Sequence, residues 1–176
     1  RILVLIPHPD DEAVGAALAI RRAVAGGAAV FGLDLTHGCP AHAATPERVA
    51  RRRREALAAA AELGLTRLPD DGLPARTLCR TLPNAYRRVL AAIDAHAIDT
   101  LWAPAYEGAH ADHDCANALA FAAQRSRPGL GAWEFAEYNN AGGRVRANRF
   151  PSTRGGEIAL ELADEEEGRW KTRLLA

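Results

Sequence analysis

Residues 2–6 form a run of five apolar residues, Ile-Leu-Val-Leu-Ile, which ends at Pro7. An uninterrupted apolar run is typical of a strand that is buried on both faces, as the strands of a parallel sheet are. Residues 11–25 then show a helical pattern, with acidic residues in the first turn and two glycines as the stop. A doubly buried strand followed at once by a helix favours an α/β fold with a parallel sheet.

The rest of the chain continues this alternation. Residues 46–63 carry strong helix signals, because Thr45 can cap the start, Pro46 suits the first turn and Gly64 can end the helix. We therefore predict an α/β, Rossmann-like, mostly parallel sheet with helices on both faces, folded as a single domain over residues 1–176. The other predicted strands are 29–36, 100–103, 132–138 and 157–162, the other predicted helices are 84–95, 113–126 and 164–175, and the predicted loops are 68–83 and 139–156.

Composition argues against several classes of protein. Lys+Arg and Asp+Glu number 22 each, so the zero net charge gives no bulk attraction to nucleic acid or to an anionic membrane. No apolar run approaches the ~18 residues of a membrane-spanning helix, and we expect no transmembrane segment and no signal peptide. The cysteines, Cys39, Cys79 and Cys115, are sparse and odd in number, which fits a reducing compartment. We expect a cytoplasmic protein.

The sequence PHPDDE at residues 7–12 follows the first strand directly. Its prolines end the strand and hold His8 extended at the carboxyl edge of the sheet, where α/β folds bind ligands. Asp11 begins the helix, so a turn can bring its carboxylate to the His8 ring, and this pair is common in zinc sites. Asp10 then lies beside the metal, where a general base belongs. The structural alternative is a helix start capped by acids; a dinucleotide site loses support because GxGxxG is missing.

The second motif is HADH at residues 110–113, which follows the strand around Trp102 and opens a helix. Two histidines three residues apart can share one face of a first helical turn. One can bind the metal while the other points at the substrate as an acid or oxyanion donor, and Asp112 could orient an imidazole. An HxxH pair alone is weak evidence, since most such pairs are surface histidines. Together with the first motif, it predicts a metal centre.

In these two motifs the sequence resembles the LmbE/PIG-L superfamily of zinc-dependent N-deacetylases. The similar segments are HPDDE at 8–12, the most specific one, and YEGAHADHD at 106–114, with LTxG at 35–38 and RxxE at 52–55. Members of this superfamily remove acetyl groups from N-acetylglucosamine-type sugars, so the resemblance implies a deacetylase that holds one zinc ion per chain. Ala109 and Ala111 replace a usual glycine and proline, which concerns the loop's shape and removes no chemical group.

The resemblance also implies roles for individual residues. Carried over by position, the metal ligands are His8, Asp11 and His113. The general base is Asp10, and the protonated histidine is His110.

Weaker candidates for contacts with the substrate or with a ligand are Asp112, Tyr106, Arg52 and His37. Arg52 belongs to a run of four arginines that fan around a helix, for which a solvated surface is the plainer interpretation. His37 can line the site or be an ordinary loop histidine. The implied substrate is a small N-acetylated sugar. The alternatives are a hydrolase of a non-sugar amide or ester, and a metal-containing domain that binds a metabolite without catalysis.

Overall fold

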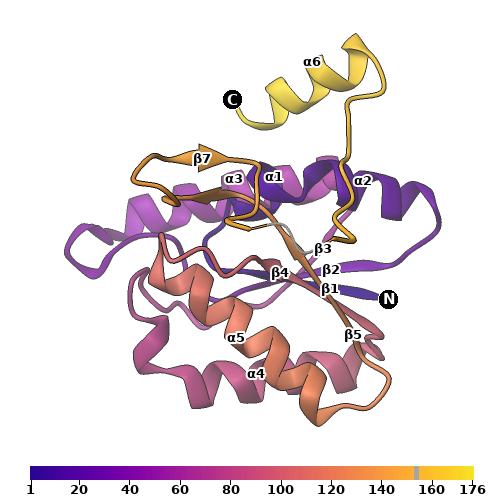
Figure 1. Ribbon diagram of the computed structural model, residues 1–176. Coiled ribbons are helices and arrows are strands. Elements are labelled where there is room, and N and C mark those ends of the chain that lie inside the picture. Colours follow the sequence, from indigo (N-terminus) through magenta and orange to yellow (C-terminus); the bar gives the residue numbers. More distant parts are fainter. Residues whose placement is uncertain (153–154) are drawn as a thin grey trace.

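A five-stranded parallel sheet forms the centre of the protein (Figure 1). The computed structural model describes residues 1–152 and 155–176, and the predicted loop 139–156 therefore lies partly outside the described residues. The strand order is β3-β2-β1-β4-β5: the chain adds β2 and β3 on one side of β1 and then β4 and β5 on its other side, as in a Rossmann-like fold. The strands are β1 (Ile2–Ile6), β2 (Val30–Asp34), β3 (Thr66–Leu68), β4 (Thr100–Pro104) and β5 (Gly131–Phe135).

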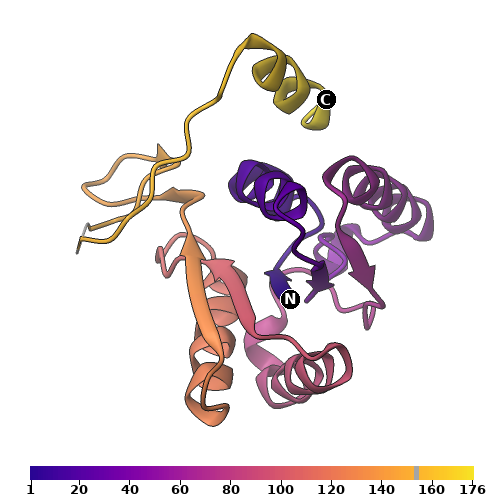
Figure 2. The same ribbon diagram turned by 90° about the vertical axis from the view of Figure 1, so that its right-hand side faces the viewer.

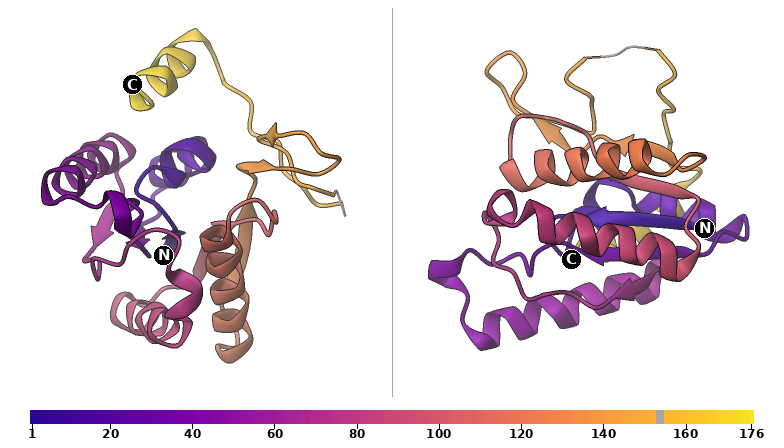
Figure 3. Two further views of the ribbon diagram at one scale, coloured as in Figure 1. Left: turned by 90° about the vertical axis from the view of Figure 1, so that its left-hand side faces the viewer. Right: turned by 90° about the horizontal axis from the view of Figure 1, so that it is seen from below.

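Helices cover both faces of the sheet, which confirms the predicted fold class (Figures 2 and 3). One face carries α1 (Asp11–Gly15), α2 (Ala17–Ala25) and α3 (Pro46–Leu63), and the other carries α4 (Leu82–His96) and α5 (Ala111–Ser126). Helix α6 (Glu165–Leu174) lies outside α2, where its buried Trp170 covers the guanidinium of Arg21 at 4.3 Å. None of the helices in these described residues combines the length and apolar character that crossing a bilayer requires.

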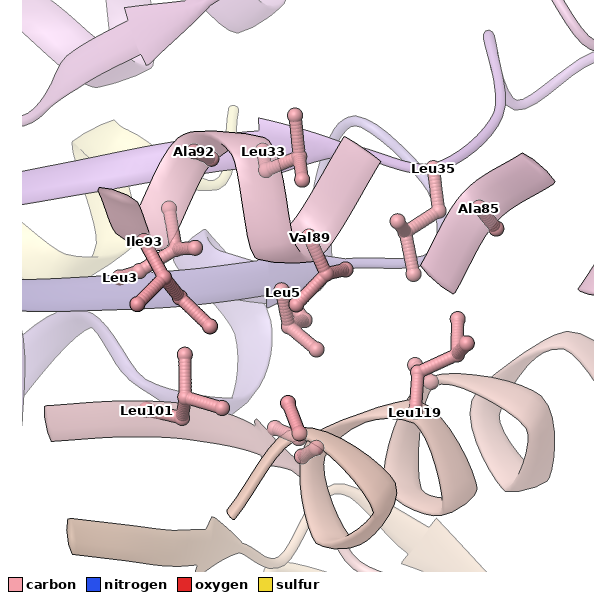
Figure 4. Close-up of a cluster of buried hydrophobic side chains, with 14 of the residues drawn as sticks. Leu3, Leu5, Leu33, Leu35, Ala85, Val89, Ala92, Ile93, Leu101 and Leu119 are labelled. Atoms are coloured by element: carbon pink, nitrogen blue, oxygen red, sulfur yellow. The ribbon is translucent and has the colours of Figure 1, made fainter. Parts of the chain in front are cut away.

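The position of strand β1 explains its apolar sequence, because every one of its residues is buried. Leu3 and Leu5 face Val89 of α4 and Leu119 of α5 (Figure 4), whereas the side chain of Val4 faces the α2 and α3 layer. Successive side chains of a strand point to opposite faces. A strand between two helical layers therefore needs apolar residues at every position.

Helix α3 has the bounds that its sequence signals predict. The Thr45 hydroxyl accepts a hydrogen bond from the Arg48 amide at 3.3 Å, and Gly64 ends the helix in the left-handed conformation with φ 70°. The predicted helix 11–25, in contrast, is divided at Ala16, where φ is −119°. Next to the break, Gly15 lies against Phe135 of β5, and a Cβ there would stand 2.6 Å from the Phe135 ring.

Two local predictions were wrong, and one strand was missed. Residues 157–162 form no strand: Ile158, Leu160 and Leu162 are exposed, and a short apolar segment does not by itself supply a neighbouring strand to pair with. The segment 132–138 is divided into β5 and β6 (Tyr138–Asn139), and β6 pairs antiparallel with β7 (Arg146–Ala147) inside the predicted loop. Strand β3 was missed because three residues carry too little periodicity to be recognised. Two short 3₁₀ turns, η1 (Ala41–Ala43) and η2 (Leu78–Arg80), complete the fold.

Candidate metal centre and active site

The two predicted motifs meet at the carboxyl edge of the sheet, where the strand order reverses. His8 follows β1, and His110 and His113 lie at the start of α5, which follows β4. Because β1 and β4 are adjacent and parallel, the segments that leave them emerge side by side. Ligand sites of open α/β sheets occur at this kind of position.

Three of the predicted residues place one donor atom each in an equilateral triangle. His8 Nδ1, Asp11 Oδ2 and His113 Nε2 are each 3.4 Å from the other two. Tetrahedral zinc with ligand bonds of ~2.0–2.1 Å requires donors roughly 3.3–3.4 Å apart. Two imidazole nitrogens and one carboxylate oxygen are also a donor set that zinc accepts in catalytic sites. The residues present therefore fit a single divalent cation.

The electrostatics of this cluster favour a positive charge at its centre. Burial lowers the pKa of His8, but hydrogen bonds and charge from Asp11 and Asp112 outweigh it and raise the pKa to about 9. Burial works in the opposite direction on Asp11, yet its hydrogen bonds to His113 and His8 hold its pKa well below the usual range. The carboxylates that attract protons here would also attract a metal ion, with which those protons compete.

Asp112 is fully buried and lies behind His8. Its Oδ2 is 3.0 Å from His8 Nε2, on the side of the ring opposite the triangle. The backbone amides of Arg76 and Leu78 donate to the two oxygens of Asp112 at 2.6 and 3.2 Å. Asp112 is thus fixed from several directions and fixes the His8 ring in turn.

His110 caps the start of α5 and faces the same space. Its Nδ1 accepts a hydrogen bond from the Asp112 amide at 3.1 Å, so Nε2 is the nitrogen that carries a proton in the neutral ring. Its ring packs edge-on against His8, with ring centroids 4.6 Å apart. Burial and the neighbouring His8 lower the pKa of His110. The Nε2–H can donate a hydrogen bond even when the imidazole is neutral.

Asp10 precedes the candidate ligand Asp11 in the chain. Its carboxylate is bound by Arg52, which the sequence analysis gave as a weak candidate for a contact with the substrate. Both terminal nitrogens of the Arg52 guanidinium donate to Asp10 Oδ2 at 3.1 Å. The Asp10 side chain is 46% exposed, so a water molecule can reach it. These contacts fall on Oδ2, which leaves Oδ1 as the oxygen better placed to accept a proton.

The remaining weak candidates are Tyr106 and His37. Tyr106 is 65% exposed in the loop before α5. His37 accepts the Cys39 amide on Nδ1 and lines a cavity of about 210 Å³ beside Pro9, under α3. Asn139, a polar residue of the 139–156 loop, is buried and donates to the Arg149 carbonyl at 2.7 Å, so its side chain holds the hairpin.

Sequence reasoning missed two groups of buried acids near the triangle. Glu137 is 5% exposed, with Oε2 3.6 Å from His113 Nδ1, and the Tyr138 ring lies 5.4 Å from the His113 ring. On the other side, Arg67 of β3 pairs with both Glu12 and Asp34 beneath α1. No partner was predicted for Glu12, and nothing in the sequence indicated that Arg67, 55 residues away, would be that partner.

The parallel sheet and the histidine–carboxylate cluster at its edge define the class of protein, an α/β protein with a candidate metal centre. Residues 3–124 match the sequence profile described as PIG-L, GlcNAc-PI de-N-acetylase, and the chain belongs to this family. No curated protein matches the sequence.

Solved structures share the fold at low identity. The A40926 pseudoaglycone deacetylase Dbv21 has a TM-score of 0.73 and 22% identity over 99% of this chain and 79% of its own. The N,N'-diacetylchitobiose deacetylase of Pyrococcus horikoshii has a TM-score of 0.68 and 19% identity over 99% and 69%. GalB, the 4-carboxy-2-hydroxymuconate hydratase of Pseudomonas putida KT2440, has a TM-score of 0.56 and 21% identity over 78% of this chain and 64% of its own. The fold therefore accommodates more than one reaction, and the site must decide which.

Proposed function

We propose that the protein removes the N-acetyl group from a small molecule that contains N-acetylglucosamine, with one zinc ion held by His8, Asp11 and His113. The observation that carries the proposal is the triangle of donor atoms, each 3.4 Å from the other two. A bound zinc ion would polarise the acyl carbonyl and lower the pKa of a water molecule towards ~7.

The side chains around the triangle can supply the proton transfers of amide hydrolysis. Asp10 takes a proton from the attacking water, which adds to the acyl carbon, and the Arg52 guanidinium holds its carboxylate in place. The His110 Nε2–H donates to the carbonyl oxygen as negative charge develops on it. Asp10 then returns the proton to the departing nitrogen. The C–N bond breaks, and the products are a free amine and acetate.

The substrate class is supported by the family and by the chemistry of the site. The family profile is that of a GlcNAc-PI de-N-acetylase, and two of the similar structures are deacetylases, of the A40926 pseudoaglycone and of N,N'-diacetylchitobiose. A cytoplasmic location is part of the proposal, because Cys39, Cys79 and Cys115 are all unpaired thiols.

Hydrolysis of a non-sugar amide or ester would use the same residues in the same roles. The proposed base Asp10, which precedes the candidate ligand Asp11, and the proposed donor His110, whose ring lies 4.6 Å from that of His8, argue against a domain that binds a metabolite without catalysis.

The test is to incubate zinc-loaded protein with a panel of N-acetylglucosamine glycosides, acylated amino acids and simple esters. Release of primary amine and acetate from the glycosides is the expected result. Metal-free protein and the Asp10→Ala variant are the controls. If only esters or acylated amino acids react, the sugar assignment is wrong and the hydrolase assignment survives.

A further inference from the structure

Each candidate histidine ligand has a carboxylate behind the ring nitrogen that does not face the triangle. Behind His8, this carboxylate is Asp112, at 3.0 Å. Behind His113, it is Glu137, whose Oε2 is 3.6 Å from Nδ1. Among the described residues, neither His113 Nδ1 nor Glu137 Oε2 has a hydrogen-bond partner, although both atoms are buried. The two buried polar atoms therefore face each other, and neither has another hydrogen-bond partner among the described residues.

The chemistry of imidazole makes one of these atoms a donor. If His113 binds a metal through Nε2, its neutral ring must carry its proton on Nδ1. A buried N–H without an acceptor is unfavourable, because it has lost its hydrogen bonds to water and gained none in the protein. Glu137 Oε2 is the acceptor that faces it, and a small rotation of either side chain closes the 3.6 Å gap to an ordinary hydrogen bond of ~2.9 Å.

The backbone around Glu137 is held in place by the loop that leads into α5. The Glu107 carboxylate accepts the Glu137 amide at 2.9 Å on one oxygen and the Tyr138 amide at 3.1 Å on the other. The Glu107 amide in turn donates to Asp114 Oδ1, one residue after His113, at 3.1 Å. The loop and helix that carry His113 therefore also fix the position of Glu137, so the pair is held together before any metal binds.

We propose that Glu137 is a positioning residue of the metal centre. Its carboxylate accepts the Nδ1–H of His113, and this hydrogen bond fixes the ring orientation that points Nε2 into the donor triangle. The inference rests on the proposed metal site. A competing arrangement has Glu137 as a direct ligand, because ligand atoms of Asp11, His113 and Glu137 lie within 4.8 Å of one another.

The experiment compares Glu137→Ala and Glu137→Gln with the control Glu134→Gln, which neutralises an exposed carboxylate of the adjoining strand β5 and keeps the oxygen that accepts a hydrogen bond from Asn117. The dissociation constant for zinc is measured by competition with a chromogenic chelator. We expect Glu137→Ala to weaken zinc binding about 10- to 100-fold, as loss of a hydrogen bond behind a ligand does. Glu137→Gln should recover much of the affinity, because its amide oxygen also accepts an N–H. The control should bind zinc like the wild type.

Two further measurements separate positioning from other roles. Metal-free Glu137→Ala should give the same circular dichroism spectrum as the metal-free control, so that weaker zinc binding is not a loss of the fold, and the cobalt(II) absorption bands of Glu137→Gln should match the wild type. Zinc affinity of Glu137→Ala equal to that of the control, or altered cobalt bands in Glu137→Gln, would each overturn the proposal. Wild-type protein that binds no zinc would overturn the proposed metal site itself, which is a different result.

Discussion

At the scale of single residues, two adjacent carboxylates are proposed to have different roles, Asp11 as a metal ligand and Asp10 as the general base. Asp11 is buried within the donor triangle, whereas Asp10 is partly exposed and bound by Arg52. Asp11→Ala should lose bound zinc in elemental analysis. Asp10→Ala should retain about one zinc per chain and lose roughly 10²–10⁴-fold in kcat, the usual contribution of a general base. Zinc lost from Asp10→Ala and kept by Asp11→Ala would reverse the assignment.

Arg52 offers a second test at this scale. Its guanidinium holds Oδ2 of Asp10, and a charge-assisted hydrogen bond of this kind contributes about 1.5–3 kcal/mol before solvent screening. With the partial exposure of both groups, we expect kcat for Arg52→Ala to fall about tenfold, with unchanged zinc content. Arg54→Ala, an exposed arginine of the same helix, is the matched control. Equal kcat in the two variants would rule out a role for Arg52 in holding the base.

At the scale of elements, a buried ion cluster joins α1 to two strands. Arg67 of β3 pairs with Glu12 and with Asp34 of β2, and it donates to the Ala56 carbonyl of α3 at 3.1 Å. Burial is the largest influence on Glu12 and raises its pKa to about 7, even though Arg67 acts in the opposite direction. Because Asp11 precedes Glu12, this cluster also fixes the start of the helix that carries a candidate ligand.

Removing the cation from that cluster should therefore be costly. Arg67→Met leaves two buried carboxylates without their partner, and we expect the free energy of unfolding in urea to fall by about 3–5 kcal/mol. Arg127→Ala breaks the exposed pair with Asp94 and should cost less than about 1 kcal/mol. Adding Glu12→Gln and Asp34→Asn to Arg67→Met should recover part of the loss. Similar destabilisation by Arg67→Met and Arg127→Ala would contradict this account.

At the scale of the whole molecule, the candidate ligands lie on segments that follow two different strands, and His8 and His113 are 105 residues apart in the chain. A metal ion bound there would tie these segments together. It should stabilise the folded state by about 2.7 kcal/mol when free zinc is 100 times the dissociation constant. For a chain of this size, that corresponds to a rise in Tm of roughly 5–10 °C. Calorimetry with and without a chelator measures the shift, and His113→Ala should not show it.

The sequence by itself determined the features that depend on neighbouring residues. The apolar run at Ile2–Ile6 predicted a doubly buried strand, and Thr45 and Gly64 marked the ends of α3. Capping, helix propensity and periodicity act over a few residues, so a single sequence displays them. The two histidine motifs likewise contain the residues that form the donor triangle, and their places after parallel strands indicated that they would meet.

Tertiary structure alone decided which distant groups became partners. Glu137 lies behind His113 because β5 is adjacent to β4, and Arg67 reaches Glu12, 55 residues away, because β3 lies beside β2. The segment 157–162 was predicted as a strand, yet its residues are exposed and form no strand. Strand pairing and buried ion pairs depend on how the whole chain packs. A local pattern indicates which residues can pair, whereas only the packed sheet determines which residues they pair with.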